Sequence, residues 1–271
     1  MEMQEHSEPR VALVTGATGA IGKAIARQIA ARTGYAVILG CRNKERAKDA
    51  VEEISRATGN RSVRYELVDV SRQASVIALA ARWRGPLHVL VNNAAVTPRR
   101  RQETPEGIEL QFATNVLGYF WMIRAFNETL KRSAPSRVVN VGSYWAGDLD
   151  LADLEFRRRP YSNHEAYRQS KQADRMLTVA LAERLKPYAV TVNACHPGDV
   201  HSTLSGNLGF GGSQTPDEGA RTPAWLALEP VGQRYTGHYF EQMNDVHCPF
   251  GAETKAVTAL YEACLGYDRT A

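Results

Sequence analysis

The sequence has no apolar run that approaches the roughly 20 residues needed to cross a membrane. It has only four cysteines, and the spacing of Cys41, Cys195, Cys248 and Cys264 does not match a metal site. We therefore expect these thiols to be packing residues in a reducing compartment, with no metal bound. Internal repeats, low-complexity tracts and an early Pro/Ser linker are also missing. Their absence favours one domain over residues 1–271.

Charge of one sign is only in small excess, with a net charge of +4 and 23% charged residues. The densest basic clusters, Arg99–Arg101 and Arg157–Arg159, are short, and no nucleic-acid motif accompanies them. They are typical of a solvated loop face, with aid to an anionic substrate or cofactor as the alternative, and we expect no nucleic-acid partner. Residues 1–10 lack the basic-then-apolar order of a signal peptide. We expect a flexible lead-in over residues 1–9, a cytoplasmic location and no membrane partner.

Short β-branched runs alternate with helical segments along most of the chain. The run RVALVT at 10–15 contains the continuous apolar stretch VALV and is too short for a helix, which suits a strand buried on both faces. The same reasoning predicts further strands at 35–40, 62–68, 87–91, 137–142, 188–195 and 235–240. It predicts helices at 21–32, 44–57, 71–83, 106–132, 164–186, 217–228 and 253–265. This alternation predicts an α/β, single-domain Rossmann fold, a doubly wound parallel sheet with helices on both faces.

The segment at 205–223 differs from the rest of the chain because glycine and proline are frequent in it. So many helix breakers exclude a long regular element there. We interpret about 203–223 as a substrate flap that becomes ordered when ligands bind.

Three glycines follow the first predicted strand and precede the first predicted helix. They are Gly16, Gly19 and Gly22, with Thr18 and Ile21 between them. Small residues let the backbone approach a phosphate, and a helix N-terminus presents unpaired N–H groups and the positive end of its dipole. The strand–turn–helix context therefore predicts a pyrophosphate site of a dinucleotide.

The residues after the second predicted strand bear on which dinucleotide is bound. An acidic residue there would bond the ribose 2′-hydroxyl of NAD, but the chain has Arg42, Asn43 and Lys44, with no acid before Glu45. The planar guanidinium of Arg42 can bind a 2′-phosphate, although a plain surface arginine is the alternative. The pattern predicts that NADP(H) is preferred over NAD(H).

Polar residues also follow the next two strands. Asp69 and Val70 close the third strand, where a carboxylate or a backbone group could meet the adenine. Asn92 and Asn93 close the fourth. Because buried amides need partners, we expect this pair to lie outside the core and either to bind the cofactor backbone or to brace neighbouring strands.

A tyrosine and a lysine, Tyr167 and Lys171, are four residues apart in a predicted helix and therefore share one face. A phenol with a pKa of about 10 is a poor acid–base catalyst at neutral pH, but a neighbouring ammonium and a positive nicotinamide ring would stabilise the phenolate. Ser143 directly follows a predicted strand, where its hydroxyl could hold a substrate oxygen. These residues predict a Ser–Tyr–Lys site for hydride transfer.

Together these motifs resemble the short-chain dehydrogenase/reductase superfamily over nearly the whole chain. The similar phrases are TGATGAIG from 15, DV from 69, NNAA from 92, Asn115, VNVGS ending at 143, YRQSK from 167 and HPG from 196. Within the superfamily the chain is most similar to the retinol dehydrogenase-like group. The phrases that carry this similarity are CRN from 41, QFATNVLG from 111 and PDEGA from 216.

The resemblance implies roles for individual residues. Tyr167 would be the general acid in carbonyl reduction and the base in alcohol oxidation, while Lys171 would bond the nicotinamide ribose and lower the pKa of the tyrosine. Ser143 would orient the substrate oxygen, and Asn115 would hold a water that relays protons to Lys171. Cofactor contacts are expected from the glycine turn and from Arg42, Asn43, Asp69 and Val70. Further contacts are expected from Asn93, Ala94, Tyr167, Lys171, Pro197, Val200 and Ser202.

These residues predict NADP(H)-dependent interconversion of a small-molecule carbonyl compound and an alcohol. The residues predicted to line the substrate pocket are Tyr144, Trp145, Leu204, Leu208 and Phe210, which favour an apolar or aromatic substrate. Two alternatives use the same fold: a non-catalytic dinucleotide-binding regulator, and an epimerase or dehydratase that returns the hydride within one turnover. The sequence leaves open whether the chain forms a homo-oligomer.

Overall fold

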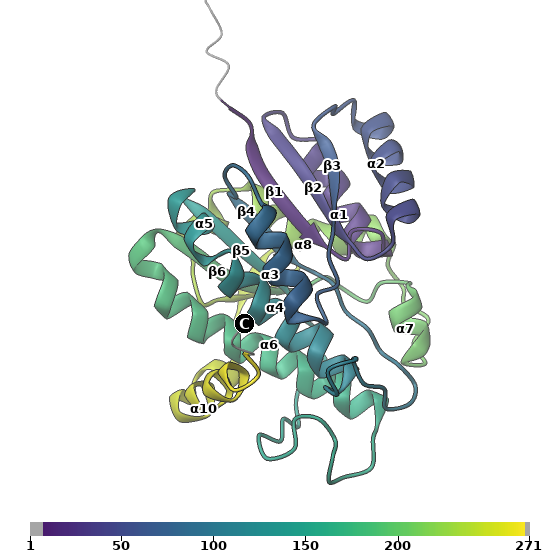
Figure 1. Ribbon diagram of the computed structural model, residues 1–271, viewed down its shortest axis with the longest axis vertical. Helices are drawn as coiled ribbons and strands as arrows, with labels where there is room; N and C mark the ends of the chain where they lie inside the picture. The colour runs from purple at the N-terminus through teal and green to yellow at the C-terminus, as the bar shows by residue number, and fades with distance from the viewer. Residues whose placement is uncertain (1–7, 269–271) are drawn as a thin grey trace, which may run out of the picture.

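The computed structural model describes residues 8–268, so the start of the expected lead-in lies outside the described residues. One 8-stranded sheet runs through the molecule in the order β3-β2-β1-β4-β5-β6-β7-β8 (Figure 1). The strands are β1 (Arg10–Thr15), β2 (Tyr35–Cys41), β3 (Val63–Leu67), β4 (Val89–Asn92), β5 (Ser136–Val141), β6 (Val190–His196), β7 (Tyr239–Glu241) and β8 (Asn244–Val246). Neighbouring strands are parallel except for β7 and β8, which are antiparallel.

Helices connect most of the strands. The α-helices are α1 (Ala20–Ala30), α2 (Lys44–Thr58), α3 (Gln73–Arg82), α4 (Gly118–Ala125), α5 (Asn127–Arg132), α6 (Asn163–Leu185), α7 (Thr203–Asn207), α8 (Pro216–Leu228), α9 (Val231–Arg234) and α10 (Thr254–Leu265). A π-helix, η1 (Phe112–Leu117), precedes α4, and two 3-10 turns are η2 (Lys186–Tyr188) and η3 (Pro249–Gly251). The predicted doubly wound α/β fold is confirmed.

The sheet separates two apolar cores, one on each face. Helices α1, α2 and α8 contribute to one core, with alternate residues of β1 such as Ala12 and Val14. Helices α3, α4, α6 and α10 contribute to the other, with Leu13 of the same strand. Successive side chains of a strand point to opposite faces, so a strand covered on both sides must be apolar throughout. This is why the run RVALVT forms β1.

The strand order reverses between β1 and β4, because the chain builds outward to β3 on one side and to β8 on the other. In a sheet of this kind, the crevice beyond the carboxyl ends of the two central strands is where ligands bind. The glycine turn follows β1, and Asn93 follows β4. The fold therefore brings two of the motifs from the sequence to the same crevice.

The helical stretch predicted at 106–132 is confirmed from 110 onward, but it starts later than expected and is divided into η1, α4 and α5. Gly107 has a φ of 81° in a turn whose ends pair through a bridge between Glu103 and Glu109. The helical path then starts at Leu110 and passes into η1, and the two carboxylate oxygens of Glu109 accept the backbone N–H groups of Gln111 and Phe112. Burial raises the pKa of Glu109 to about 7. A break after α4 gives the separate short helix α5.

The C-terminal region also differs from the prediction. The strand expected at 235–240 begins only at Tyr239, and an antiparallel strand, β8, was not predicted. Gln242 and Met243 connect the two strands with positive φ values of 48° and 62°. Short polar strands joined by non-glycine residues in this conformation leave little signal in a sequence. The segment at 203–223 includes α7 and the start of α8, of which only α8 was predicted.

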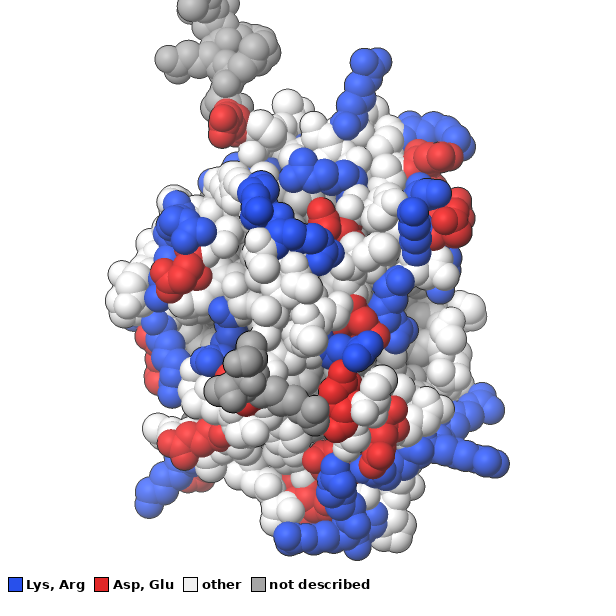
Figure 2. Space-filling model, viewed as in Figure 1, with Lys and Arg blue, Asp and Glu red and all other residues white. Residues whose placement is uncertain are grey.

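Ion pairs offset the two basic clusters noted in the sequence. The Arg101 guanidinium lies 2.6 Å from the Glu103 carboxylate, and Arg157 and Arg159 pair with Glu155 and Asp153 at 3.0 and 3.7 Å. On the face shown in Figure 2, basic and acidic residues are interspersed. This arrangement agrees with a solvated surface.

Candidate functional site

The glycine turn after β1 is closely packed. The Gly16 N–H donates to Gly40 O, and Gly16 adopts a φ of 64° that favours glycine. A Cβ on Gly16 would lie 2.8 Å from the Ala94 Cα, and one on Gly22 would lie 2.4 Å from the Gly16 oxygen. Gly19 caps α1 without a side-chain hydrogen bond, and the first turn of α1 has no acidic residue. The N–H groups at this helix start are therefore suited to an anion.

Asparagines at the end of β4 hold the central strands together. Asn93 Nδ2 donates to Thr15 O at 3.0 Å, and its backbone N–H donates to Thr15 Oγ1 at 2.9 Å. Asn92 Nδ2 donates to Asn140 Oδ1 on β5 at 3.0 Å. Asn92 is fully buried, so the expectation that it lies outside the core is wrong. Its amide nitrogen is accommodated there because Asn140 accepts its N–H and in turn donates to Thr178 Oγ1, whereas Asn92 Oδ1 has no hydrogen-bond partner among residues 8–268.

Two adjoining cavities occupy the crevice. The first, called the turn groove, runs past the glycine turn and the ends of β2 and β3. Of the residues predicted to bind cofactor, it is lined by Gly16, Thr18, Gly19, Ile21, Gly22, Arg42, Asn43, Asp69, Val70, Asn93, Ala94 and Ser202. The second, called the tyrosine cavity, is lined by the predicted residues Ile21, Asn93, Ser143, Tyr144, Trp145, Tyr167, Lys171, Pro197, Val200, Ser202, Leu204, Leu208 and Phe210. The two share a wall that includes Ile21, Asn93 and Ser202.

The far end of the turn groove is basic. Arg42 is exposed there, and Asn43 caps α2 by accepting the Arg46 N–H. Arg46 also lines the groove, and its guanidinium donates to Thr18 O at 3.0 Å. Sequence reasoning missed Arg46, although its position four residues after Arg42 at the start of a helix was a usable signal. Asp69 Oδ1 accepts the N–H and the hydroxyl of Ser71, which fixes the loop after β3.

Tyr167 and Ser143 reach the tyrosine cavity from different elements. Tyr167 lies one turn into α6, which begins at Asn163 with Ser162 as its cap. Ser143 lies just after β5, and both side chains are buried. Burial raises the pKa of Tyr167 above its ordinary value, while Lys171 and a hydrogen bond with Ser143 act in the opposite direction. The expected effect of Lys171 thus has the right sign, but burial outweighs it in this structure.

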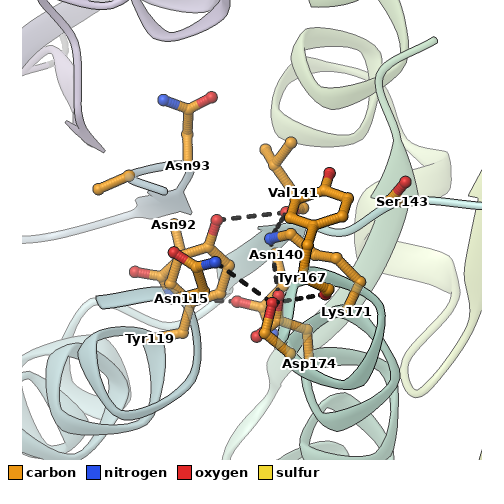
Figure 3. Close-up of polar contacts among 12 residues, drawn as sticks. Asn92, Asn93, Asn115, Tyr119, Asn140, Val141, Ser143, Tyr167, Lys171 and Asp174 are labelled. Carbon is orange, nitrogen blue, oxygen red and sulfur yellow. Dashed lines mark hydrogen bonds and ion pairs between the residues drawn. The ribbon is translucent and has the colours of Figure 1, made fainter. Parts of the chain in front are cut away.

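Lys171 lies deeper, behind the tyrosine. Its Nζ donates to Val141 O at 3.0 Å and to Asp174 Oδ2 at 2.8 Å (Figure 3). Burial alone would lower the pKa of Lys171, but Asp174 together with Tyr119 and Tyr167 raises it above the usual range. Sequence reasoning did not single out Asp174, even though its spacing of three residues places it on the same helical face as Lys171.

Asn115 lines neither cavity. It is fully buried within η1, where its Oδ1 accepts the Val96 N–H and its Nδ2 donates to Val96 O and to Ser170 Oγ. The side chain thus joins η1 to the segment after β4 and to α6, next to the turn that carries Tyr167. Its expected role in holding a water stays a prediction.

Aromatic side chains surround the mouth of the tyrosine cavity. The Trp145 ring lies 5.9 Å from the Tyr167 ring, 4.8 Å from Phe210 and 5.4 Å from His164. The predicted pocket residues thus come together, and the unpredicted His164 joins them. His196, also missed, lines the cavity; burial lowers its pKa to about 4, so its imidazole is neutral at physiological pH.

The arrangement provides a groove for a dinucleotide that leads into a cavity with a buried phenol, a hydroxyl and an ammonium. Residues 10–209 match the family model described as short chain dehydrogenase. The chain belongs to the short-chain dehydrogenase/reductase family, and within it the chain is similar to retinol dehydrogenases. It is an NAD(P)-dependent oxidoreductase that acts on CH–OH and C=O groups of a small molecule.

Two relatives and one solved structure show what the chain is similar to. A probable oxidoreductase from Streptomyces antibioticus is 35% identical, over 90% of this chain and 88% of its own. Retinol dehydrogenase 13 from Mus musculus is 34% identical, over 87% of this chain and 76% of its own. A crystal structure of an uncharacterised protein from Mycobacterium paratuberculosis matches with a TM-score of 0.80 and 27% identity, over 95% of this chain and 92% of that one.

Two further findings concern membranes and metals. Between residues 8 and 268, no helix is both long and apolar enough to span a bilayer. Within the same part of the chain, no cluster of three or more His, Cys, Asp or Glu side chains is arranged to hold a metal ion. Of the four cysteines, Cys41, Cys195 and Cys264 are buried, and Cys248 is half-buried.

Proposed function

We propose that the protein reduces an apolar or aromatic ketone or aldehyde with NADPH, or oxidises the corresponding alcohol, through Ser143, Tyr167 and Lys171. The observation that carries the proposal is the convergence of these three side chains on one cavity that shares a wall with the turn groove. The single-domain organisation, with about 203–223 as a substrate flap, is part of the same proposal.

The residues of the turn groove fit a dinucleotide. Gly16 and Gly22 leave no room for a side chain, and the uncapped start of α1 is suited to a pyrophosphate. Arg42 and Arg46, at the far end, favour a 2′-phosphate over a hydroxyl. NADP(H) bound here would supply or accept the hydride. Asn93 and the segment from Pro197 to Ser202 would then lie beside its nicotinamide end.

The protein's own residues would handle the proton. In reduction, the Tyr167 hydroxyl donates its proton to the substrate oxygen, and in oxidation the phenolate accepts one. Ser143 holds the same oxygen by a hydrogen bond, which aligns the reacting carbon. Lys171 stabilises the phenolate by its positive charge, and it would also hold the nicotinamide ribose by a hydrogen bond. The wall formed by Trp145, Leu204, Leu208 and Phe210 would exclude water and favour an apolar substrate.

A panel of carbonyl compounds and alcohols, followed by NADPH absorbance, tests the function. Net NADPH consumption supports the reductase; a regulator would bind NADPH without consuming it, and an epimerase or dehydratase would convert substrate without net change in NADPH.

Tyr167→Phe tests the assignment of the proton donor. We expect turnover to fall at least ~100-fold, a typical general-acid contribution, with NADPH affinity unchanged. Tyr161→Phe is the matched control, because Tyr161 bonds Gln111 and Pro98 and lines neither cavity. Full turnover in Tyr167→Phe would show that another group moves the proton.

The cytoplasmic location stays a prediction, and whether the chain forms a homo-oligomer stays open.

A further inference from the structure

The buried carboxylate beside Lys171 has no part in the reaction as proposed so far. Asp174 and Lys171 are 1% and 2% exposed. They form an ion pair at 2.8 Å, three residues apart on α6 (Figure 3). Resting on the proposed function, we propose that Asp174 is a positioning residue, which holds the Lys171 ammonium and sets, through it, the proton affinity of Tyr167.

The hydrogen bonds of Lys171 show how it is held. An ammonium has three donors, and two of them are used on Val141 O and Asp174 Oδ2. The Tyr119 hydroxyl donates to the same carbonyl of Val141 at 3.2 Å. Lys171 is therefore fixed from β5 and from its own helix. One donor remains for the ribose or the phenol in front of it.

A contribution to the stability of the fold does not by itself explain the position of Asp174. Its Oδ1 is buried and has no hydrogen-bond partner among residues 8–268, so half of the carboxylate is unsatisfied. Buried ion pairs of this kind contribute little net stability, because desolvation of both charges opposes their attraction. A charge at such a position is better explained by its effect on the group it contacts.

The titratable and charged groups around the pair come from four elements. Tyr167 and Lys171 lie on α6, Tyr119 on α4, and the Cys264 thiol on α10 faces Asp174. The Cys195 thiol on β6 faces Lys171. Among these groups Lys171 is the only cation within the described part of the chain. Its charge is therefore balanced by Asp174 alone when that carboxyl is ionised.

The charges of Lys171 and Asp174 also affect the phenol of Tyr167. The Lys171 Nζ lies 5.9 Å from the centre of the Tyr167 ring. Lys171 lowers the pKa of Tyr167, and Asp174 raises it. With Asp174 neutral and Lys171 still protonated, the charge of Lys171 would act on Tyr167 without compensation. The phenolate would then form at lower pH.

Asp174→Asn removes the charge and keeps the size and an oxygen that can accept from Lys171. In alcohol oxidation with saturating NADP⁺, activity rises with pH as Tyr167 loses its proton. We expect this rise in kcat to move to lower pH by at least about half a pH unit in the variant. Cys264→Ala is the matched control: it changes packing beside Asp174 but no charge, so its pH profile should coincide with that of the wild type.

A measurement without turnover separates this proposal from the proposed function. In protein labelled with 3-fluorotyrosine, the fluorine resonance absent from Tyr167→Phe belongs to Tyr167, and its titration gives the pKa of that phenol directly. Asp174→Asn should lower this value even if no substrate is turned over. Asp174→Ser, which is neutral and smaller, makes the same test if Asp174→Asn does not fold. An unchanged Tyr167 titration in a folded neutral variant would overturn the proposal and leave Asp174 with a structural role only.

Discussion

Gly22→Ala tests whether the close packing of α1 on the glycine turn sets both stability and cofactor binding. Gly22 is a buried residue in the first turn of α1. In an exposed helix interior, replacing glycine by alanine would stabilise by about 1 kcal/mol. Here the new Cβ would lie 2.4 Å from the Gly16 oxygen and 2.5 Å from Asn93 Nδ2.

Neither of these atoms is the free end of a flexible side chain. The Gly16 oxygen is backbone and accepts the Gly19 N–H, and Asn93 Nδ2 is bonded to Thr15 O. The turn itself must therefore move. Overpacking of this kind destabilises by about 1–3 kcal/mol, and contacts this short belong at the upper end. The clash outweighs the helix preference, so we expect a net loss of about 2 kcal/mol.

Urea denaturation gives the stability, and NADPH fluorescence gives the affinity. A loss of about 2 kcal/mol lowers the folding equilibrium constant about 30-fold. Displacement of even one N–H from the pyrophosphate should weaken NADPH binding about tenfold. Gly206→Ala in α7 is the control, because a Cβ there meets no atom within 4 Å. Wild-type stability and affinity in Gly22→Ala would refute the argument that the turn admits only glycine.

Three further predictions concern coenzyme choice, the flap and pH. Arg42→Asp should weaken NADPH binding tenfold to a hundredfold, about 1.5–3 kcal/mol, while NADH binding is unchanged or improved. Arg46→Asp should act in the same direction. A wild-type protein that prefers NADH, measured at equal salt, would contradict this prediction. Amides of 206–212 should exchange faster in the free protein than with cofactor and substrate bound, and equal protection would count against a flap. The pKa of Glu109 is raised to about 7 in the folded state, so its carboxyl binds a proton more tightly there than in the unfolded chain. The resulting stabilisation is full below the unfolded pKa of about 4.5. It is lost, by about 3 kcal/mol at most, as pH rises through about 7. In urea denaturation at pH 5 and 8, the free energy of unfolding of Glu109→Gln should not show this loss. If the free energy of unfolding falls equally between the two pH values in the wild type and the variant, Glu109 is not the cause.

The sequence was informative where a single local rule decides the structure. Strands buried on both faces appear as apolar runs, and the turn after β1 needs glycine at Gly16, so both were predicted. The helix was predicted to begin too early, at 106, although Pro105 and Gly107, which lie in the turn after Thr104, mark its boundary in the sequence. Strand β8 has only three residues and is defined by its pairing with β7, so the sequence has no hydrophobic periodicity that would predict it.

The predicted site shows the same division. Ser143, Tyr167 and Lys171 could be proposed from the sequence because the spacing of Tyr167 and Lys171 and the end of the strand before Ser143 are visible in it, and the three side chains do line one cavity. Asp174 and Arg46 were overlooked although their spacings from Lys171 and Arg42 are visible in the sequence, and only the structure shows that they contact Lys171 and Thr18. Asn92 was placed outside the core because its partner, Asn140, lies on another strand. Side chains that act through a neighbour, rather than through a motif, need the structure.

The two outermost strands of the sheet have a consequence for association. A free strand edge is a template on which other chains can add, and proteins oppose this with short or charged edges. Here β8 has only three residues, all exposed, with Asp245 at its centre. At the opposite end, β3 carries Arg64 and Glu66. Both edges thus resist growth of the sheet into fibrils.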